Sequence, residues 1–265
     1  MTVLKMWDTA PGLNGEEPVL EYYPAENRKT NAAFVIFPGG AYVARAEHEG
    51  KGYAEFLNSI GVDAFVCEYR LLPNYVFPMA LLDARRAVRY VRFHAAEYGL
   101  DPEKIAVMGS SAGGHLAAMV STYRKPIVYE SDDAVDALSP IPNASVFCYA
   151  VTGDAFDDNT NWFYRSLLGD PNASDEACLE VAPSLMVDDD TPPAFFWHTS
   201  DDGLVNVKHI YRYASALRDH GIPHEMHVFP SGHHGLGLAG DHPHVAQWSG
   251  LLANWLNDLG WMDHK

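Results

Sequence analysis

The chain alternates short apolar runs with amphipathic stretches, and this rhythm restricts the folds open to it. Predicted strands lie at 32–37, 62–69, 105–109, 145–151, 195–199 and 225–229. Predicted helices lie at 52–60, 78–98, 113–123, 207–220 and 245–259. Continuous apolar strands that alternate with helices predict a mostly parallel sheet with helices on both faces. Such sheets bind ligands beyond the carboxyl ends of their strands, so the loops there are expected to carry the chemistry.

One stretch interrupts this alternation. Residues 152–193 are polar, acidic and rich in turn-forming residues, and they are too many for an ordinary connection. We interpret them as an excursion over the edge of the sheet or as a small cap on the site. The sequence contains no internal repeat and no linker, so residues 1–265 are predicted to form a single domain.

Charge and composition narrow the classes of partner. The 265 residues include 18 Lys and Arg against 35 Asp and Glu, a formal net charge of −17. Such a charge repels nucleic acid and anionic membranes, and no apolar run of about 18 residues predicts a transmembrane helix. Three cysteines predict no disulfide framework, and the first residues do not resemble a signal peptide. We therefore expect a cytoplasmic protein without nucleic acid or membrane partners, and a homo-oligomer is compatible with the sequence.

The strongest local motif is Gly109-Ser110-Ser111-Ala112-Gly113. It matches G-x-S-x-G between a predicted strand and a predicted helix, which is the context that a nucleophilic serine requires. The turn exposes the serine Oγ near the positive end of the helix. Ser111 is the candidate nucleophile because it has glycine two residues away on both sides, and Ser110 is the alternative.

A serine nucleophile needs a base and an acid, which follow it along the chain in folds with this motif. His234 lies in a glycine-rich loop after an apolar strand and is the candidate base, with His233 as the alternative. Asp202 follows another apolar strand and is the candidate acid, with Asp201 as the alternative. A carboxylate there would hold the imidazole tautomer and stabilise the imidazolium.

The loop after the first core strand, at 37–42, is rich in small residues that let backbone amides approach a substrate. We predict an oxyanion hole formed by the N–H groups of Gly40, Ala41 and Ala112, each typically worth about 3–4 kcal/mol in the transition state. The histidine-rich stretch 233–244 is a conceivable metal site, but it lacks the helical pair or cysteine typical of zinc ligands. We predict no metal and no organic cofactor.

With these pieces in order, the chain resembles an α/β-hydrolase, and more narrowly the acetyl-esterase and lipase-like proteins related to carbohydrate (xylan) acetyl esterases. The resemblance implies a mostly parallel central sheet flanked by helices on both faces, with a small cap or none. It also implies Ser111, Asp202 and His234 as a catalytic triad. Pro38 and Ala41 depart from the HGGG pattern, where a His and the third Gly stand, but both allow backbone donation. The segments that carry the resemblance are 38–42, 68–71, 78–92, 109–116, 191–193, 198–202 and 232–237.

The resemblance further implies a serine esterase that removes acetyl groups from small acetylated carbohydrates such as xylo-oligosaccharides. As substrate contacts we predict aromatic surfaces from Tyr42 and Trp162, and hydrogen bonds to sugar hydroxyls from His48 and Arg45. His233, which stands where many relatives have Gly, is a further candidate contact.

Two other functions remain as alternatives. An arylformamidase-type amidohydrolase fits because related proteins share Ser-Ala-Gly-Gly-His from the nucleophile onward, as residues 111–115 do here. A non-catalytic binding protein with a hydrolase fold is the alternative from another class, and it would be expected to carry a damaged triad or oxyanion loop. We interpret His115 in the shared motif as a packing residue.

Overall fold

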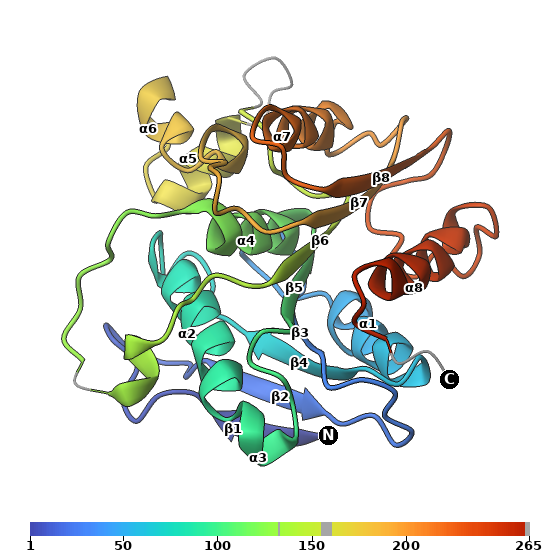
Figure 1. The fold of residues 1–265 in the computed structure, drawn as a ribbon. Helices are drawn as coiled ribbons and strands as arrows, with labels where there is room; N and C mark the ends of the chain where they lie inside the picture. Colours follow the sequence, from blue (N-terminus) through green and yellow to red (C-terminus); the bar gives the residue numbers. More distant parts are fainter. Residues whose placement is uncertain (132, 155–160, 263–265) are drawn as a thin grey trace.

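A computed structural model describes residues 1–131, 133–154 and 161–262. Its core is one continuous eight-stranded sheet (Figure 1). The strand order is β1-β2-β4-β3-β5-β6-β7-β8. The six strands from β4 to β8 pair in parallel, whereas β1 and β2 pair antiparallel at one edge. The strands are β1 (Thr2–Lys5), β2 (Val19–Tyr23), β3 (Ala33–Phe37), β4 (Asp63–Glu68), β5 (Ile105–Ser110), β6 (Ala144–Cys148), β7 (Ala194–Thr199) and β8 (His224–Phe229).

Helices cover both faces of this sheet, as predicted. Helices α1 (Glu47–Ser59) and α8 (Trp248–Asp258) pack on one face, where they bury Phe34 and Ile36 of β3. The other face packs against α2, α4 and α7 and receives Val35 and Phe37. These three helices are α2 (Met79–Phe93), α4 (Ser111–Thr122) and α7 (Lys208–Asp219). The shorter helices are α3 (Ala95–Tyr98), α5 (Asn161–Leu168), α6 (Asp175–Leu179), η1 (Ala134–Ala137), η2 (Pro183–Leu185) and η3 (Val245–Gln247).

Three of the differences between the structure and the predicted elements concern whole strands or the bounds of helices near the site. Strands β1 and β2 were not predicted, because antiparallel strands with partly exposed residues lack the continuous apolar run of a buried parallel strand. Helix α1 begins at Glu47 rather than at residue 52, and acidic residues in a first helical turn are favoured by the helix dipole. The helix predicted at 78–98 is divided into α2 and α3 at His94.

The predicted cap at 152–193 lies between β6 and β7, and its residues 155–160 lie outside the described residues. Its helix α5 is fixed to the body of the fold: the Leu167 carbonyl accepts a hydrogen bond of 2.9 Å from the Phe77 amide. The Tyr164 hydroxyl donates to the Gly153 carbonyl, and the Phe163 ring lies 5.8 Å from that of Tyr42. The described part of this excursion therefore packs beside the loop that follows β3.

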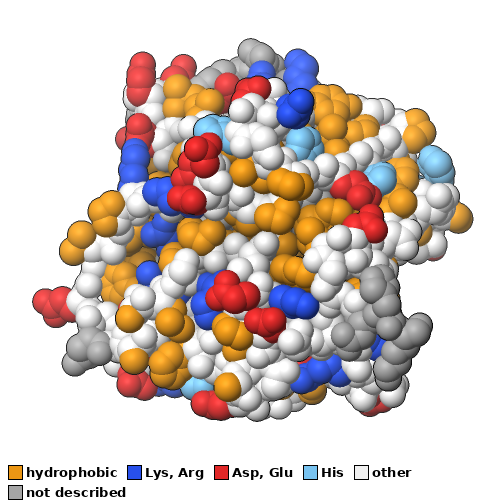
Figure 2. Space-filling view, viewed as in Figure 1, with side chains coloured by type: hydrophobic (Ala, Val, Ile, Leu, Met, Phe, Trp, Pro, Cys, Tyr) orange, Lys and Arg blue, Asp and Glu red, His pale blue; other side chains and the backbone are white. Residues whose placement is uncertain are grey.

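On the face shown in Figure 2, acidic and basic side chains are interspersed with apolar ones. Within the described ranges, no helix combines the length and apolar character needed to cross a bilayer. All three cysteines, Cys67, Cys148 and Cys178, are buried free thiols.

Candidate active site

The turn between β5 and α4 holds Ser111 in a left-handed backbone conformation that residues other than glycine rarely adopt. Strand β5 ends at Ser110, and Ser111 begins α4 with a φ of +52°. A Cβ added at Gly109 would come 2.1 Å from the Gly113 carbonyl oxygen, and one added at Gly113 would come 2.0 Å from that of Phe37. Both glycines of the motif are therefore needed for the strand and helix to approach closely enough to form the turn.

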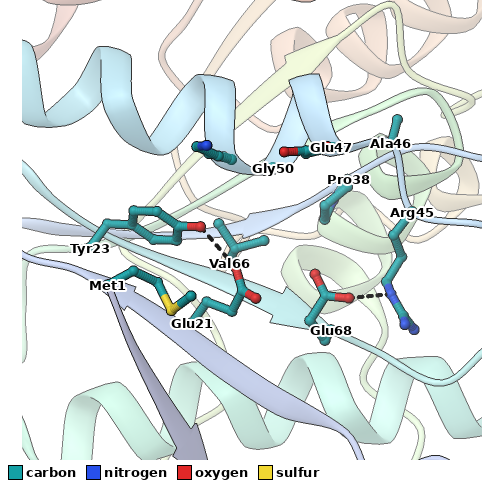
Figure 3. A pocket seen from close by; sticks show the side chains of 11 residues that line it. Met1, Glu21, Tyr23, Pro38, Arg45, Ala46, Glu47, Gly50, Val66 and Glu68 are labelled. Carbon is teal, nitrogen blue, oxygen red and sulfur yellow. Dashed lines mark hydrogen bonds and ion pairs between the residues drawn. The ribbon is translucent and has the colours of Figure 1, made fainter.

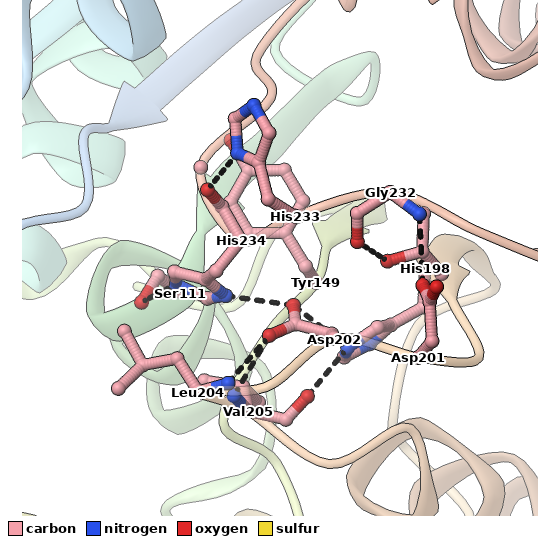
Figure 4. Close-up of polar contacts among 12 residues, drawn as sticks. Ser111, Tyr149, His198, Asp201, Asp202, Leu204, Val205, Gly232, His233 and His234 are labelled. Atoms are coloured by element: carbon pink, nitrogen blue, oxygen red, sulfur yellow. Dashed lines mark hydrogen bonds and ion pairs between the residues drawn. The ribbon is translucent and has the colours of Figure 1, made fainter.

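The two neighbouring serines of this motif have different surroundings. Ser110 is fully buried, and its Oγ lies 2.8 Å from the Tyr53 hydroxyl. The Oγ of Ser111 instead lies 2.8 Å from Nε2 of His234 (Figure 4). Only the predicted nucleophile is thus placed against an imidazole.

His234 connects this serine to a carboxylate. Its Nδ1 lies 2.8 Å from Oδ2 of Asp202, whose side chain is 1% exposed. Because an ionised carboxylate only accepts hydrogen bonds, Nδ1 carries the proton and Nε2 is left to accept from Ser111. The structure therefore brings together the three predicted residues, from the loops after β5, β7 and β8, in the order a general base requires.

The surroundings of Asp202 keep it ionised. Burial by itself raises the pKa of this carboxyl, but hydrogen bonds from His198 and His234 outweigh that effect, and the pKa lies well below its usual range. The fully buried His198 donates from Nε2 to the Val205 carbonyl at 2.8 Å and lies 3.4 Å from Asp202 Oδ2. The backbone N–H of Val205 donates to the other carboxylate oxygen at 3.0 Å. This contact of His198 was not predicted from the sequence.

The alternative acid and base lie beside the site with other partners. Asp201 accepts a hydrogen bond of 2.8 Å from the Gly232 amide and so supports the loop that carries His234. The imidazole of His233 donates from Nδ1 to the His234 carbonyl at 2.8 Å, and its ring packs edge-on against His242. His233 also lines an open hollow of about 580 Å³ beside His234.

The loop after β3 lies against Ser111, the predicted nucleophile. A Cβ added at Gly39 would come 3.2 Å from the Cβ of Ser111. The next three residues, Gly40, Ala41 and Tyr42, all have positive φ values, of 131°, 53° and 61°. This run of left-handed backbone makes the tight turn that the small residues of the loop predict.

The three predicted oxyanion donors have different backbone settings. Within the described part of the chain, the N–H groups of Gly40 and Ala41 have no hydrogen-bond acceptor. Ala112 is the second residue of α4, where a helix leaves its N–H groups without an acceptor of its own. These amides are available to a developing negative charge.

The predicted contact of Tyr42 with substrate is wrong, because its side chain does not form an exposed surface. It is buried, and its hydroxyl lies 2.7 Å from Nδ1 of His115. The Val181 carbonyl lies 2.8 Å from His115 Nε2, so Nε2 carries the proton and Nδ1 accepts from Tyr42. Burial lowers the pKa of His115 to about 4 and keeps it neutral, which fits the predicted packing role.

The other predicted substrate contacts differ in their exposure. Trp162 of α5 is 53% exposed and so offers a free aromatic surface. His48 is exposed, but its Nε2 already donates to the Gly235 carbonyl at 3.0 Å. Arg45 is only 13% exposed, because it pairs with Glu68 and donates to the Tyr69 carbonyl at 2.6 Å.

The Arg45–Glu68 pair lines a second hollow, of about 500 Å³, behind the loop after β3 (Figure 3). Ser111 and His234 are not among its lining residues, so it is separate from the predicted nucleophile and base. The pair braces the chain between the loop after β3, which carries the predicted oxyanion donors, and α1.

Two buried polar residues beside the site were not predicted. Glu49 of α1 accepts hydrogen bonds from the Gly39 amide at 2.7 Å and from the Tyr149 hydroxyl at 2.6 Å. Tyr149 follows β6, and its ring lies edge-on to that of His234, with 5.0 Å between centroids. No local sequence signal marks these roles, because the helix predicted at 52–60 begins beyond Glu49 and Tyr149 lies in an apolar run.

Comparison with known proteins places this arrangement in a family. The BD-FAE family model matches residues 20–217, about three quarters of the chain. The chain belongs to the BD-FAE family. The fold of this BD-FAE family member closely resembles the crystal structure of an acetyl ester-xyloside bifunctional hydrolase from Caldicellulosiruptor lactoaceticus. The two share 38% identity with a TM-score of 0.91, over 99% of this chain and 97% of the other. The fold is therefore that of an α/β-hydrolase, as predicted.

Curated relatives of this BD-FAE family member are longer proteins. It is 35% identical over 222 residues to the endo-1,4-beta-xylanase B of Butyrivibrio fibrisolvens, a match covering 82% of this chain and 34% of the relative. It is 30% identical over 237 residues to an acetylxylan esterase of Xylanibacter ruminicola, covering 86% of this chain and 45% of the relative. The chain thus spans less than half the length of these two relatives.

Proposed function

We propose that this BD-FAE family member is a serine esterase that removes acetyl groups from acetylated sugars such as xylo-oligosaccharides. The observation that carries the chemistry is the pair of 2.8 Å hydrogen bonds from Ser111 to His234 and from His234 to Asp202. The sugar class is supported by the acetylxylan esterase and the acetyl ester-xyloside hydrolase among the relatives. An intact constellation of this kind favours an enzyme over a non-catalytic binding protein.

The proposed reaction has two steps. Nε2 of His234 takes the proton of Ser111 Oγ, which attacks the ester carbonyl carbon. The amides of Gly40, Ala41 and Ala112 donate to the resulting oxyanion. His234 then returns the proton to the leaving alcohol, which departs and leaves an acyl-enzyme.

The second step reverses the roles of these groups. A water molecule loses a proton to His234 and attacks the acyl carbon, and Ser111 leaves with the proton that His234 returns. Asp202 remains ionised throughout and holds the imidazole in the tautomer that can accept at Nε2. Every proton in this cycle is held by a group of the chain, the water or the substrate.

For the sugar we propose contacts at the exposed ring of Trp162 and in the hollow lined by His233. Aromatic rings offer a flat apolar face, and imidazoles offer hydrogen bonds to hydroxyls. We also propose a cytoplasmic location, which is supported by three free cysteines, since a reducing compartment keeps thiols unpaired.

The test is acetate release from acetylated xylo-oligosaccharides and from 4-nitrophenyl acetate. Ser111→Ala is expected to lower turnover of both by about 10⁶-fold. Ser110→Ala is the matched control, because it removes a hydroxyl one residue away that is buried against Tyr53, and it should keep most of the activity.

Each outcome bears on a different part of the proposal. Turnover of the activated ester alone would leave the mechanism standing and remove the sugar assignment, and a formyl-anilide substrate would then test the arylformamidase alternative. Full activity of Ser111→Ala would overturn the mechanism. A wild type inactive on all three substrates would favour a binding protein.

A further inference from the structure

A buried carboxylate lies beneath the site and takes no part in the proposed chemistry. Glu49, the third residue of α1, is 3% exposed. Its Oε2 accepts from the Gly39 amide at 2.7 Å and its Oε1 accepts from the Tyr149 hydroxyl at 2.6 Å. A buried charge is costly unless each of its oxygens is paired, so this arrangement demands an explanation.

One arm of Glu49 holds the oxyanion loop. Gly39 lies between Glu49 and the nucleophile, since a Cβ added there would come 2.5 Å from Glu49 Oε2 and 3.2 Å from Ser111 Cβ. The Gly39 carbonyl accepts from the Ala46 amide at 2.9 Å, so both backbone groups of this residue are held by the first turn of α1 and the residue before it. The amides of Gly40 and Ala41 follow directly along the chain.

The other arm of Glu49 reaches the loop that carries the base. The Tyr149 hydroxyl donates to Glu49 and accepts from the Gly237 amide at 3.0 Å. The Tyr149 ring also packs edge-on against the imidazole of His234 at 5.0 Å. The Gly237 carbonyl in turn accepts from Trp248 Nε1 at 3.1 Å, which ties the loop to α8.

We propose that Glu49 is a positioning residue that fixes the oxyanion loop and the His234 loop relative to each other through Gly39 and Tyr149. This inference rests on the proposed function. The role requires a carboxylate, because only an ionised carboxylate accepts at both oxygens. An amide at this position places its NH₂ group against either the Gly39 N–H or the Tyr149 hydroxyl.

The test compares Glu49→Gln and Tyr149→Phe with wild type on 4-nitrophenyl acetate. Active sites are counted by stoichiometric labelling of Ser111 with a phosphonate ester, so that unfolded protein is left out of the rate. Each variant is expected to lower kcat per labelled site by about 10- to 100-fold, since small displacements of reacting groups cost rates of this order. KM should stay within about threefold, because the lost contacts do not touch substrate.

The chain offers a control carboxylate with matching partners at the start of β4. Asp63 is fully buried, accepts from the Ala25 amide at 2.9 Å and from the Tyr22 hydroxyl at 2.7 Å, and pairs with Arg28. It lies at the amino end of β4, whereas the site lies beyond the carboxyl ends of the strands. Asp63→Asn and Tyr22→Phe should lower the melting temperature while kcat per labelled site stays at the wild-type value.

A positioning role also predicts coupling between the two variants. Because Glu49 and Tyr149 act in one chain of contacts, the double variant should lose less activity than the product of the two single losses. If Glu49→Gln does not fold, Tyr149→Phe carries the test alone, since it leaves the Gly39 anchor in place.

Two outcomes would overturn the inference. One is a kcat per labelled site for Tyr149→Phe or Glu49→Gln within about twofold of wild type, as for the Asp63 control. The other is fully multiplicative losses in the double variant. Failure of the proposed function is a different result, because then wild type itself would release no acetate or the label would not be on Ser111.

Discussion

Nε2 of His48 donates a hydrogen bond to the carbonyl oxygen of Gly235, 3.0 Å away. The contact joins the second residue of α1 to the residue that follows His234. A Cβ added at Gly237 would come 2.8 Å from the His48 ring, so the same imidazole also packs along the loop. His48 therefore supports the loop that carries His234 from the surface of the molecule, where its side chain is 58% exposed.

This contact separates two roles for His48. If His48 acts through the loop, His48→Ala should lower kcat on 4-nitrophenyl acetate and on acetylated xylo-oligosaccharides by the same factor, about tenfold. If His48 binds sugar, as the sequence analysis predicted, the variant should raise KM for the oligosaccharides and leave the small ester unchanged. Steady-state kinetics on the two substrates distinguishes these results, and we expect the first.

Asp202→Asn should lower kcat by about 10⁴-fold, because an amide no longer holds the imidazole in the tautomer that accepts at Nε2. Asp201→Asn is the matched control, since its amide oxygen can still accept from the Gly232 amide, and its activity should remain near wild type. Kinetics on 4-nitrophenyl acetate measures both. Equal losses in the two variants would contradict the assignment of Asp202 as the acid.

The stability of the fold should fall between pH 6.5 and pH 4. Burial lowers the pKa of His115 from 6.5 to about 4, so the unfolded chain binds a proton in this range that the folded chain does not. The resulting stability is fully present above pH 6.5 and is lost as the pH falls, by about 3 kcal/mol for a shift of this size. Urea unfolding at several pH values measures it.

His115→Gln provides the comparison for this pH dependence. The side chain cannot ionise, so its free energy of unfolding should fall less steeply with decreasing pH than that of wild type. Burial also lowers the pKa of His209, to about 3, so part of the slope should remain. Identical slopes for wild type and variant would show that His115 is not the group responsible.

Two helical glycines should respond in opposite directions to alanine. Gly113→Ala places a methyl group 2.0 Å from the Phe37 carbonyl oxygen and should destabilise the protein by about 3 kcal/mol or more. Gly52→Ala in α1 meets no atom within 4 Å and should stabilise it by about 0.5–1 kcal/mol. Thermal or urea unfolding of both variants checks the contrast, and a harmless Gly113→Ala would contradict the close approach of α4 to β3.

The parts of the fold that the sequence predicted well are those with a continuous physical signal. Strands β3, β5 and β7 are buried on both faces and therefore appear as unbroken apolar runs. The edge strands β1 and β2 have partly exposed residues and give no such run. The serine turn was predictable because its glycines, strand and helix are neighbours in the sequence.

The residues that were missed or misplaced depend on contacts between distant segments. Glu49 and Tyr149 are 100 residues apart, and a tyrosine at the end of an apolar strand looks like any core residue. His198 lies inside β7, where nothing local distinguishes a partner of Asp202 from a packed strand residue. Tyr42 was expected to face substrate and is buried instead. The sequence around an aromatic residue in a glycine-rich loop carries no sign of the direction in which its ring points.

Because β8 is an edge strand, the two halves of the site are expected to differ in how easily they open locally. Ser111 follows β5, which has a strand on each side, whereas His234 follows β8, which pairs with β7 alone. Local fluctuations free edge strands at a lower energetic cost than central ones, and amide hydrogen exchange reports that difference. As the temperature rises, we expect His234 to separate from Ser111 while the central strands are still paired, so that the proposed activity is lost below the melting temperature of the fold.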